Sequence, residues 1–364
     1  MRNKFQRIVM LCPDLHETGG IGFVSRMSLA TLCTLGNAGE VWSLGAPSQN
    51  HEVRHPASWS VRYANGNKPQ FARWALQAGL HSAKDQLVIA MHLQLAPAAW
   101  PLVKRGARLA VFLHGIEAWE PLSVLRARAL AEADLLLANS QFTARQFLTA
   151  NPEFRETPIK ICALGVPDVA ERTSGEADET KLPFALIVGR LSSQERYKGH
   201  DELLGIWHRV LSFRPTARLI VAGDGDDRPR LEAKAKELGL EASVEFLGSV
   251  NGATLHALYD DCAFFAMPSA REGFGLAFLE AMRAGKACIG AQGAAEEIIE
   301  HEMTGWIVPP ANPMVLLEAI HRFFEEPALC GRLGRAGRDR FRAHFTETHF
   351  QNRLARALEF ESER

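Results

Sequence analysis

Two glutamates, Glu272 and Glu280, flank a glycine–aromatic–glycine step in the stretch "REGFGLAFLE" at residues 271–280. They could be a catalytic pair, two contacts to one large ligand, or unrelated surface charges. In one continuous helix they would lie about 12 Å apart along the axis, farther than the roughly 5–9.5 Å between the paired carboxyls of glycoside hydrolases. We therefore predict a loop at "GFG" that turns into a helix, so that the two carboxylates contact different parts of one extended ligand.

The loop itself offers backbone groups to such a ligand. Its residues are Gly273, Phe274 and Gly275. The two glycines let backbone N–H groups come close to a ligand, and the start of a helix favours negative charge. An anionic group is therefore expected beside this loop.

Two cations occur in "VGRLSSQERYKGHDELL", residues 188–204. Arg190 follows a predicted strand, and Lys198 lies just before a predicted helix, where a lysine opposes the helix macrodipole. Two cations that converge on a diphosphate would explain this pattern, because fixed positive charge stabilises a leaving group as its negative charge grows. The alternative is a pair of solvated surface cations. Together with two carboxylates for ribose and sugar hydroxyls, the pattern suits a nucleotide-sugar.

A glycine-rich stretch, "ETGGIGFVSR", follows the first predicted strand. Gly20 and Gly22 permit close backbone approach and open a helix whose N–H groups would favour an anion. The alternative is a purely structural turn. A nicotinamide dinucleotide is not expected, because Ser25 stands where GxGxxG needs its third glycine and the next strand ends without an acidic residue for the ribose.

The stretch "FLHGIEAWE" carries two further candidates. His114 ends an apolar strand, so we expect it at the edge of the sheet that faces the ligand. Glu117 is the weaker candidate. In "AGDGDD", Asp224 and Asp226 could hint at a metal-bound diphosphate. However, aspartate is common in glycine-rich turns for backbone reasons, so we favour a turn and predict no metal site.

Short β-branched apolar runs alternate with helix-period segments on both sides of the chain's middle. Near-continuous apolar strands of this kind predict parallel sheets covered by helices on both faces. The predicted strands are 7–12, 40–44, 86–91, 108–114, 134–138, 159–164, 184–189, 218–223, 243–248, 263–269, 287–290 and 305–309. The predicted helices include 23–36, 70–81, 141–149, 199–213, 228–239, 252–260, one from about 275, and helical segments from 313 onwards.

The alternation lapses in "GVPDVAERTSGEADETKLP", which is polar, acidic and free of apolar period. It predicts a linker at 166–182 between an N-terminal Rossmann-like domain, 1–165, and a C-terminal one, 183–345. A last helix in 346–364 is expected to return to the first domain. The predicted fold class is therefore α/β, with two doubly wound domains and a ligand cleft between them.

Composition limits the class of protein further. Hydrophobic residues make up 47% and charged residues 23% of the 364, which is typical of a globular protein. The six scattered cysteines include no CxxC pair and suggest buried thiols in a reducing cytosol. Residues 1–165 hold 17 Lys and Arg against 11 Asp and Glu. This basic bias would suit a membrane surface or an anionic acceptor, or it reflects an ordinary mixed surface; no basic cluster suggests nucleic acid.

These motifs, in this order, resemble the retaining glycosyltransferases of family 4, which have the GT-B fold. The resemblance rests on "GGIG", "HG", "GRL…KG", "AGDG" and "EGFGLAFLEAM", spans nearly the whole chain and is strongest from 184 to 310. The segment "GAQGAAEEII…TGWIVPP" also resembles the family, with Gln292 where a second glycine often stands.

The resemblance implies a role for each matching residue. Arg190 and Lys198 would bind the donor diphosphate, and Glu280 the ribose hydroxyls. Glu272, together with the backbone of the "GFG" loop, would hold the transferred sugar. His114 would lie near that sugar and the acceptor.

The resemblance also implies the chemistry. The Gly20 and Gly22 stretch would lie near the phosphate, no metal or other cofactor would be required, and the departing phosphate would take the acceptor's proton in a front-face substitution. Neither glutamate would be a nucleophile. Closure of the cleft would complete the site.

The expected activity is transfer of a hexose from a UDP- or GDP-sugar to a hydroxyl of a glycan, a lipid-linked or a small-molecule acceptor. The expected location is the cytoplasm, with peripheral membrane association left open. One alternative is a nucleotide-sugar epimerase of the same fold, which needs no acceptor. The other is a non-enzymatic carbohydrate- or nucleotide-binding protein, against which the complete set of cations and glutamates counts.

Overall fold

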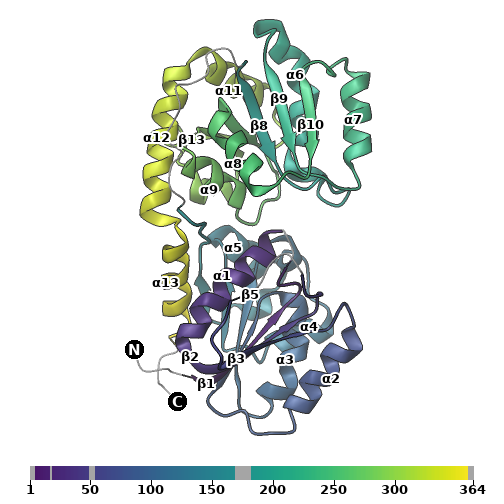
Figure 1. The fold of residues 1–364 in the computed structure, drawn as a ribbon, viewed down its shortest axis with the longest axis vertical. Helices are drawn as coiled ribbons and strands as arrows, with labels where there is room; N and C mark the ends of the chain where they lie inside the picture. The colour runs from purple at the N-terminus through teal and green to yellow at the C-terminus, as the bar shows by residue number, and fades with distance from the viewer. Residues whose placement is uncertain (1–4, 17–18, 49–53, 169–181, 360–364) are drawn as a thin grey trace. The chain divides into compact units, whose positions relative to one another are not determined.

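The computed structural model describes residues 5–16, 19–48, 54–168 and 182–359. They belong to two compact units, one formed by Met1–Leu164 with Glu347–Arg364 and the other by Gly165–Thr346. Each unit contains a parallel sheet with helices around it (Figure 1). The predicted α/β class with two doubly wound sheets is confirmed, whereas most of the predicted linker lies outside the described residues.

The sheet of the N-terminal unit has the strand order β3-β2-β1-β4-β5-β6-β7, with all neighbours parallel. Its inner strands are buried along almost their whole length, which is why they read as continuous apolar runs. The strands are β1 Phe5–Cys12, β2 Gly36–Ser43, β3 Trp59–Tyr63, β4 Gln86–Ala90, β5 Arg108–Leu113, β6 Leu135–Ala138 and β7 Ile159–Ile161.

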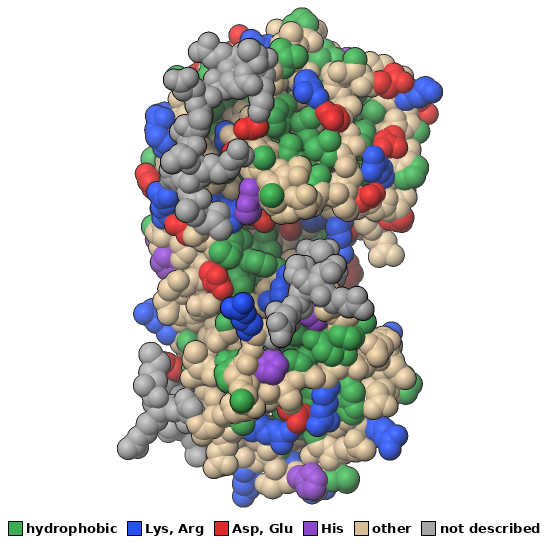
Figure 2. Space-filling model, in the orientation of Figure 1, with side chains coloured by type: hydrophobic (Ala, Val, Ile, Leu, Met, Phe, Trp, Pro, Cys, Tyr) green, Lys and Arg blue, Asp and Glu red, His purple; other side chains and the backbone are tan. Residues whose placement is uncertain are grey.

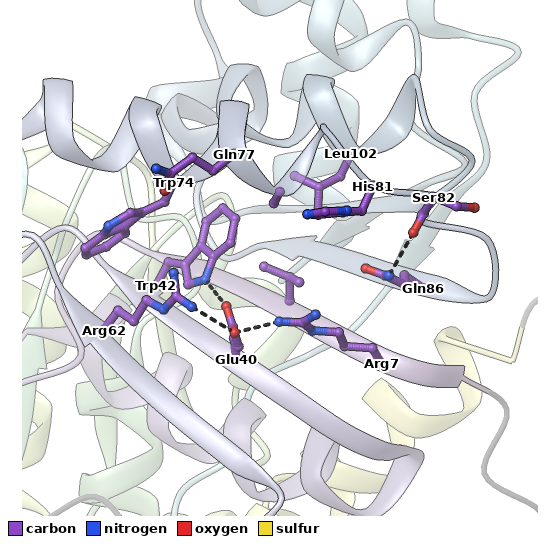
Figure 3. A pocket seen from close by; sticks show the side chains of 12 residues that line it. Arg7, Glu40, Trp42, Arg62, Trp74, Gln77, His81, Ser82, Gln86 and Leu102 are labelled. Carbon is purple, nitrogen blue, oxygen red and sulfur yellow. Dashed lines mark hydrogen bonds and ion pairs between the residues drawn. The ribbon is translucent and has the colours of Figure 1, made fainter.

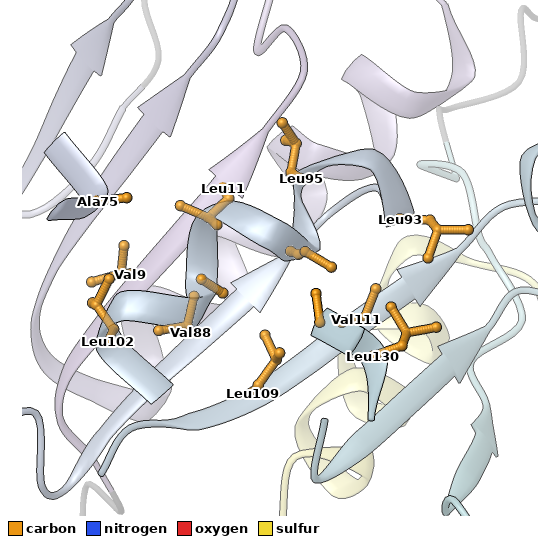
Figure 4. Packing of buried hydrophobic residues seen from close by; sticks show 14 of the residues in the cluster. Val9, Leu11, Ala75, Val88, Leu93, Leu95, Leu102, Leu109, Val111 and Leu130 are labelled. Carbon is orange, nitrogen blue, oxygen red and sulfur yellow. The ribbon is translucent and has the colours of Figure 1, made fainter. Parts of the chain in front are cut away.

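Helices cover this sheet and build its core. They are α1 Gly20–Leu35, α2 Lys68–Ala78, α3 Ala96–Val103, α4 Val124–Leu130, α5 Gln141–Ala150 and α13 Glu347–Ala357, with short 3₁₀ turns η1 Leu93–Leu95, η2 Ile116–Ala118 and η3 Pro152–Phe154. Figure 4 shows strand residues such as Val9, Val88 and Leu109 packed with Leu102 of α3. The C-terminal helix α13 packs against α1.

The sheet of the C-terminal unit has the order β10-β9-β8-β11-β12-β13 and is also parallel. Its strands are β8 Phe184–Val188, β9 Arg218–Ala222, β10 Val244–Gly248, β11 Phe264–Met267, β12 Cys288–Ala291 and β13 Gly305–Val308. The helices are α6 His200–Phe213, α7 Arg228–Glu237, α8 Gly252–Asp261, α9 Leu276–Arg283, α10 Ala295–Ile298, α11 Pro313–Glu325 and α12 Pro327–His344, with the 3₁₀ turn η4 Arg196–Lys198.

Among the described strands and α-helices, β3, α3, α4 and α10 had no predicted bounds of their own, although helix was expected in general between the strands of the first half. The strand β3 is at the edge of its sheet and partly exposed, so it lacks a continuous apolar run. In α3, Pro101 lies inside the helix, and a proline at an interior position argues against a helix in the sequence. The other two are short, with α10 only four residues long.

The order of strands reverses between β1 and β4 in one sheet and between β8 and β11 in the other. Ligands of such sheets bind beyond the carboxyl ends of the strands at this switch point. Arg190 and Lys198 follow β8, and Glu272 follows β11. The fold of the C-terminal unit therefore delivers its predicted site residues to the switch point of its own sheet.

The surface carries both signs of charge. On the face drawn in Figure 2, Lys and Arg side chains are interspersed with Asp and Glu. Across the described ranges, no helix has the length and apolar character needed to cross a membrane.

Candidate functional site

Lys198 and Glu272 form an ion pair in the C-terminal unit. The Lys198 ammonium donates to Oε2 of Glu272 across 3.1 Å, although the two residues are 74 positions apart in sequence. Their side chains are only 17% and 16% exposed. Lys198 ends the turn η4, just before α6, as the sequence predicted. The structure thus pairs the residue predicted to bind the diphosphate with the residue predicted to bind the sugar.

The "GFG" loop leads from Glu272 into α9, as predicted. Gly273, Phe274 and Gly275 are buried, and Gly275 is the N-cap of α9. Gly275 has φ 103°, and a Cβ there would lie 2.6 Å from Cδ2 of Phe278. Only glycine fits this conformation and this space, so the loop's glycine has a local physical reason.

Arg190 lies two residues after β8 and pairs with Glu195. Its side chain is 62% exposed, so the guanidinium remains accessible to a ligand from solvent. The segment that carries it is pressed against the loop after β9: a Cβ on Gly223 would lie 1.9 Å from the carbonyl oxygen of Gly189. This close approach fixes where the chain leaves β8.

An ion cluster around the buried Asp227 supports the connection that carries Lys198. Arg196 donates to Asp227, and Arg230 donates to both Asp227 and Asp201. Asp227 is 3% exposed. Hydrogen bonds from Arg230 lower the pKa of Asp201 to about 2. Because both carboxylates stay ionised, the cluster holds the turn η4 against α6 and α7.

Glu280 lies within α9 and accepts a hydrogen bond on Oε2 from the hydroxyl of Tyr259, at 2.9 Å. Burial raises the pKa of Glu280, and the Tyr259 hydrogen bond opposes that rise. Burial and the nearby carboxylate raise the pKa of Tyr259 well above its usual value, so the phenol keeps its proton. Among the described residues, Glu272 and Glu280 contact different partners.

Asp224 and Asp226 belong to a turn, as we favoured. Asp224 accepts the N–H of Gly225, and Asp226 accepts the N–H of Ser193 at 3.0 Å. Within the ranges that the structure describes, no group of three or more His, Cys, Asp and Glu side chains is arranged to hold a metal ion.

His114 follows β5 in the N-terminal unit. Its Nε2 lies 2.7 Å from the carbonyl oxygen of Met91, and its ring stacks on Phe112. Because a carbonyl oxygen only accepts, Nε2 carries the hydrogen and Nδ1 is left as an acceptor. Burial lowers the pKa of His114 to about 4, so the ring is neutral at pH 7.

Glu117 orients the backbone after β5. Its Oε1 accepts the N–H groups of His114, at 2.6 Å, and Gly115, at 3.2 Å. Asn139 donates to the His114 carbonyl at 2.6 Å. Of the two candidates in this stretch, Glu117 thus serves as a fixed support for His114.

In the glycine-rich stretch after β1, the described residues from Gly20 onwards are helical. The predicted helix from residue 23 begins at Gly20, so that Gly20 and Gly22 lie in the first turn of α1. A glycine penalises a helix interior by only about 1 kcal/mol, which tertiary packing of α1 outweighs. N–H groups in a first turn lack intrahelical acceptors, so the expected anion-binding character of the stretch is kept as a prediction.

Sequence reasoning missed Tyr259. It lies in α8, is 1% exposed, and would be read from the sequence as an ordinary core residue. A buried tyrosine needs a partner for its hydroxyl, but the sequence does not say that Glu280 supplies it.

Comparison with solved structures defines the fold class. Structures of Anabaena HepE, in complex with UDP and with UDP-glucose, superpose with a TM-score of 0.78 at 22% and 21% identity, and cover 97% of this chain and 99% of theirs. This likeness shows the GT-B fold.

Sequence comparison matches part of the chain to a known family. Residues 170–340 match the family model described as "Glycosyl transferases group 1". An uncharacterized glycosyltransferase of Methanocaldococcus jannaschii is 38% identical over 43% of this chain and 38% of its own length. The human alpha-1,3/1,6-mannosyltransferase ALG2 is 31% identical over 65% of this chain and 61% of its own length. Residues 170–340, just under half of the chain, thus match the group 1 glycosyltransferases, and the chain spans less than two thirds of each of these two relatives.

Proposed function

We propose that this protein is a retaining glycosyltransferase that transfers a hexose from a UDP- or GDP-sugar to a hydroxyl of a glycan, a lipid-linked or a small-molecule acceptor. The observation that carries the proposal is the Lys198–Glu272 ion pair beside the N-terminus of α9, at the switch point of the C-terminal sheet. The match of residues 170–340 to the group 1 glycosyltransferases supports the reaction class.

Charge exchange would drive donor binding. Lys198 and Glu272 neutralise each other. A donor diphosphate would pair with Lys198 and also contact Arg190, while the sugar hydroxyls would donate to Glu272. The helix dipole at the start of α9 would also favour the anion. The pair therefore brings together two groups that suit the two parts of the donor.

Glu280 would accept the ribose hydroxyls. Tyr259 occupies Oε2, which leaves Oε1 for the ligand. Burial makes such a hydrogen bond stronger than it would be in water. Tyr259 would thus be a positioning residue for Glu280 rather than a contact to the donor.

His114 would contact the sugar or the acceptor through Nδ1, as a hydrogen-bond acceptor. A neutral ring with pKa about 4 is not a proton donor at pH 7. The donor's own departing phosphate would take the acceptor's proton. Arg190 and Lys198 would stabilise the charge that develops on that phosphate.

The choice of nucleotide base in the donor rests only on similarity to a solved structure. One fold neighbour was solved with UDP-glucose, which favours uridine as the first donor to test. Guanosine stays in the proposal, because no described side chain separates the two bases.

The test begins with calorimetric binding of UDP, GDP and ADP, with and without magnesium. We expect one nucleotide to bind tightly and indifferently to the metal. Turnover of its sugar should then fall in Glu272→Gln with nucleotide binding largely spared, whereas Arg190→Ala should weaken both. Lys236→Met, an exposed cation of α7, is the matched control and should change neither.

Three outcomes would count against the proposal. Unchanged turnover in both site variants would remove the site assignment. Interconversion of the nucleotide-sugar without any acceptor would favour an epimerase. Absence of binding by all three nucleotides would favour a role without donor chemistry.

A further inference from the structure

A cavity of about 270 Å³ lies in the N-terminal unit, between the sheet and α2. Strand residues Arg7, Glu40 and Arg62 line its floor, and Trp74 and Gln77 of α2 line the opposite side (Figure 3). Val9, Trp42 and Leu102 of the apolar core also line it, whereas the side chains of Arg7 and Arg62 are 46% exposed. The cavity is therefore apolar on its inner side and open to solvent at its arginines, which gives a ligand access.

The cavity runs along the sheet from its amino edge. Arg7 lies near the start of β1 and pairs in register with Gln86, the first residue of β4, whereas Trp42 and Arg62 are the next-to-last residues of β2 and β3. The glycine-rich stretch begins beyond Cys12, the other end of β1. Five residues of β-strand span roughly 16 Å. A ligand held at the Arg7 end of the cavity would thus bind independently of a donor at the glycine-rich stretch.

Its floor is a buried carboxylate with two arginines. Glu40 is 9% exposed. Its Oε1 accepts from Arg7, at 2.5 Å, and from Arg62, at 3.1 Å, and its Oε2 accepts from the indole N–H of Trp42 at 2.7 Å. Three donors fix the carboxylate completely, so it serves as a rigid anchor for the two guanidinium groups.

The arginines carry more charge than the carboxylate removes. One arginine would neutralise Glu40; the second leaves one positive charge over. Both arginine side chains are 46% exposed, and each guanidinium has five N–H donors, of which Glu40 takes one. A planar fork of this kind suits carboxylate and phosphate groups. The floor is therefore built to receive an anion.

The other walls suit a hydroxylated ring. Trp74 is half-buried and held at an angle against Trp42 and Phe71. An indole face accepts the apolar C–H face of a sugar, while polar side chains around it hydrogen-bond hydroxyls. Gln77 and Gln86 supply such groups. The volume is slightly below the roughly 300–1,000 Å³ of drug-sized sites, which indicates a single monosaccharide.

We propose that this cavity binds a monosaccharide that carries a phosphate or a carboxylate group. The anionic group pairs with Arg7 and Arg62, and the sugar ring lies against Trp74 between the sheet and α2. The site is distinct from the proposed donor site and does not depend on the proposed transferase reaction.

Calorimetry on the full chain tests the proposal with four probes: glucose 6-phosphate, glucuronate, glucose and inorganic phosphate. At least one anionic hexose should bind more tightly than both glucose and phosphate, and the two anionic arms decide between phosphate and carboxylate. Arg62→Gln should weaken that binding by at least about tenfold, the equivalent of one charge-assisted hydrogen bond. Added UDP should leave it unchanged.

Two further variants protect the test against a folding defect in Arg62→Gln. Gln77→Ala changes an exposed wall residue and should weaken binding several-fold without affecting thermal unfolding. Arg73→Gln removes an exposed cation of the same helix outside the cavity and should bind like the unaltered protein. The proposal is overturned if no anionic hexose binds more tightly than glucose, if phosphate alone binds as tightly, if UDP competes, or if Arg62→Gln and Gln77→Ala both bind normally.

Discussion

Lys198 and Glu272 in the C-terminal unit neutralise each other across 3.1 Å, whereas burial keeps the ring of His114 in the N-terminal unit neutral, with Nε2 bonded to one carbonyl oxygen. Both sets follow strands of parallel sheets and are positioned by short connections. They differ in what replaces water around them: a countercharge in one unit, aromatic and backbone groups in the other.

The difference matches the ligands that the two units would meet. A nucleotide-sugar brings a diphosphate, and a site for it needs cations; the Glu272 carboxylate is the countercharge of Lys198 in this unit. An acceptor hydroxyl is uncharged. A neutral imidazole can accept its hydrogen bond without the desolvation cost of a buried charge.

The largest expected effect comes from breaking the charged half of this comparison. Lys198→Met should reduce turnover by about 10²–10³-fold, roughly 3–4 kcal/mol of transition-state stabilisation. It should also destabilise the C-terminal unit, because Glu272 is left partly buried without its countercharge. Initial rates at saturating and subsaturating donor, together with thermal unfolding, measure the two effects.

A double variant separates those effects. Lys198→Met with Glu272→Gln removes both charges, so stability should return towards that of the unaltered protein while turnover stays low. If turnover recovered together with stability, the pair would be a structural salt bridge and the comparison between the units would fail.

Acid should act next, through the neutral histidines. Burial lowers the pKa of His114 and of His200 from 6.5 to about 4. The unfolded chain therefore binds these protons first, and stability is lost as pH falls from about 6.5 to about 4. Each histidine contributes at most about 3 kcal/mol to this loss.

His114→Asn isolates the contribution of the N-terminal unit. The amide retains a donor for Met91 but does not titrate, so the variant should lose less stability on acidification than the unaltered protein. Urea unfolding at pH 7, 5.5 and 4.5 measures this, with His55→Asn, at an exposed position, as the control. Equal pH dependence in all three proteins would contradict a buried neutral His114.

A smaller effect is expected from the backbone of the "GFG" loop, which follows Glu272 in the C-terminal unit. Gly275→Ala forces a side chain into positive φ and against Phe278, which should lower the free energy of unfolding by about 2 kcal/mol and reduce donor binding. Gly205→Ala is the matched control. Gly205 is an exposed residue of α6, and a Cβ there would have no atom within 4 Å. This substitution should raise the free energy of unfolding by about 0.5–1 kcal/mol. Equal effects of the two would mean that the "GFG" loop is not conformationally restricted.

The sequence predicted the fold of both units because buried parallel strands produce continuous apolar runs. It also placed Lys198 before a helix and Gly275 at the entry to α9, since both depend on neighbours in sequence. The edge strand β3 was not predicted because only one of its five residues is fully buried.

Contacts between distant segments could not be predicted. Nothing in the sequence indicates that Lys198 pairs with Glu272, or that Tyr259 pairs with Glu280, because such pairs depend on how helices and loops pack against a sheet. The same holds for Arg7, which could not be predicted as a site residue because only the pairing of β1 with β2 brings it beside Glu40. Local chemistry is readable from sequence, whereas its partners come from the topology.

The smallest expected effect concerns one such partner. Tyr259→Phe removes a single hydrogen bond from Glu280 and should cost about 1 kcal/mol of stability. Since that bond lowers the pKa of Glu280, its loss should move the acid limb of donor binding to higher pH. A merely structural tyrosine would change stability alone. Nucleotide affinity measured from pH 5 to 8 therefore distinguishes the two roles, with Tyr197→Phe, on the turn η4, as a comparison that should leave the acid limb of the Glu280 carboxylate in place.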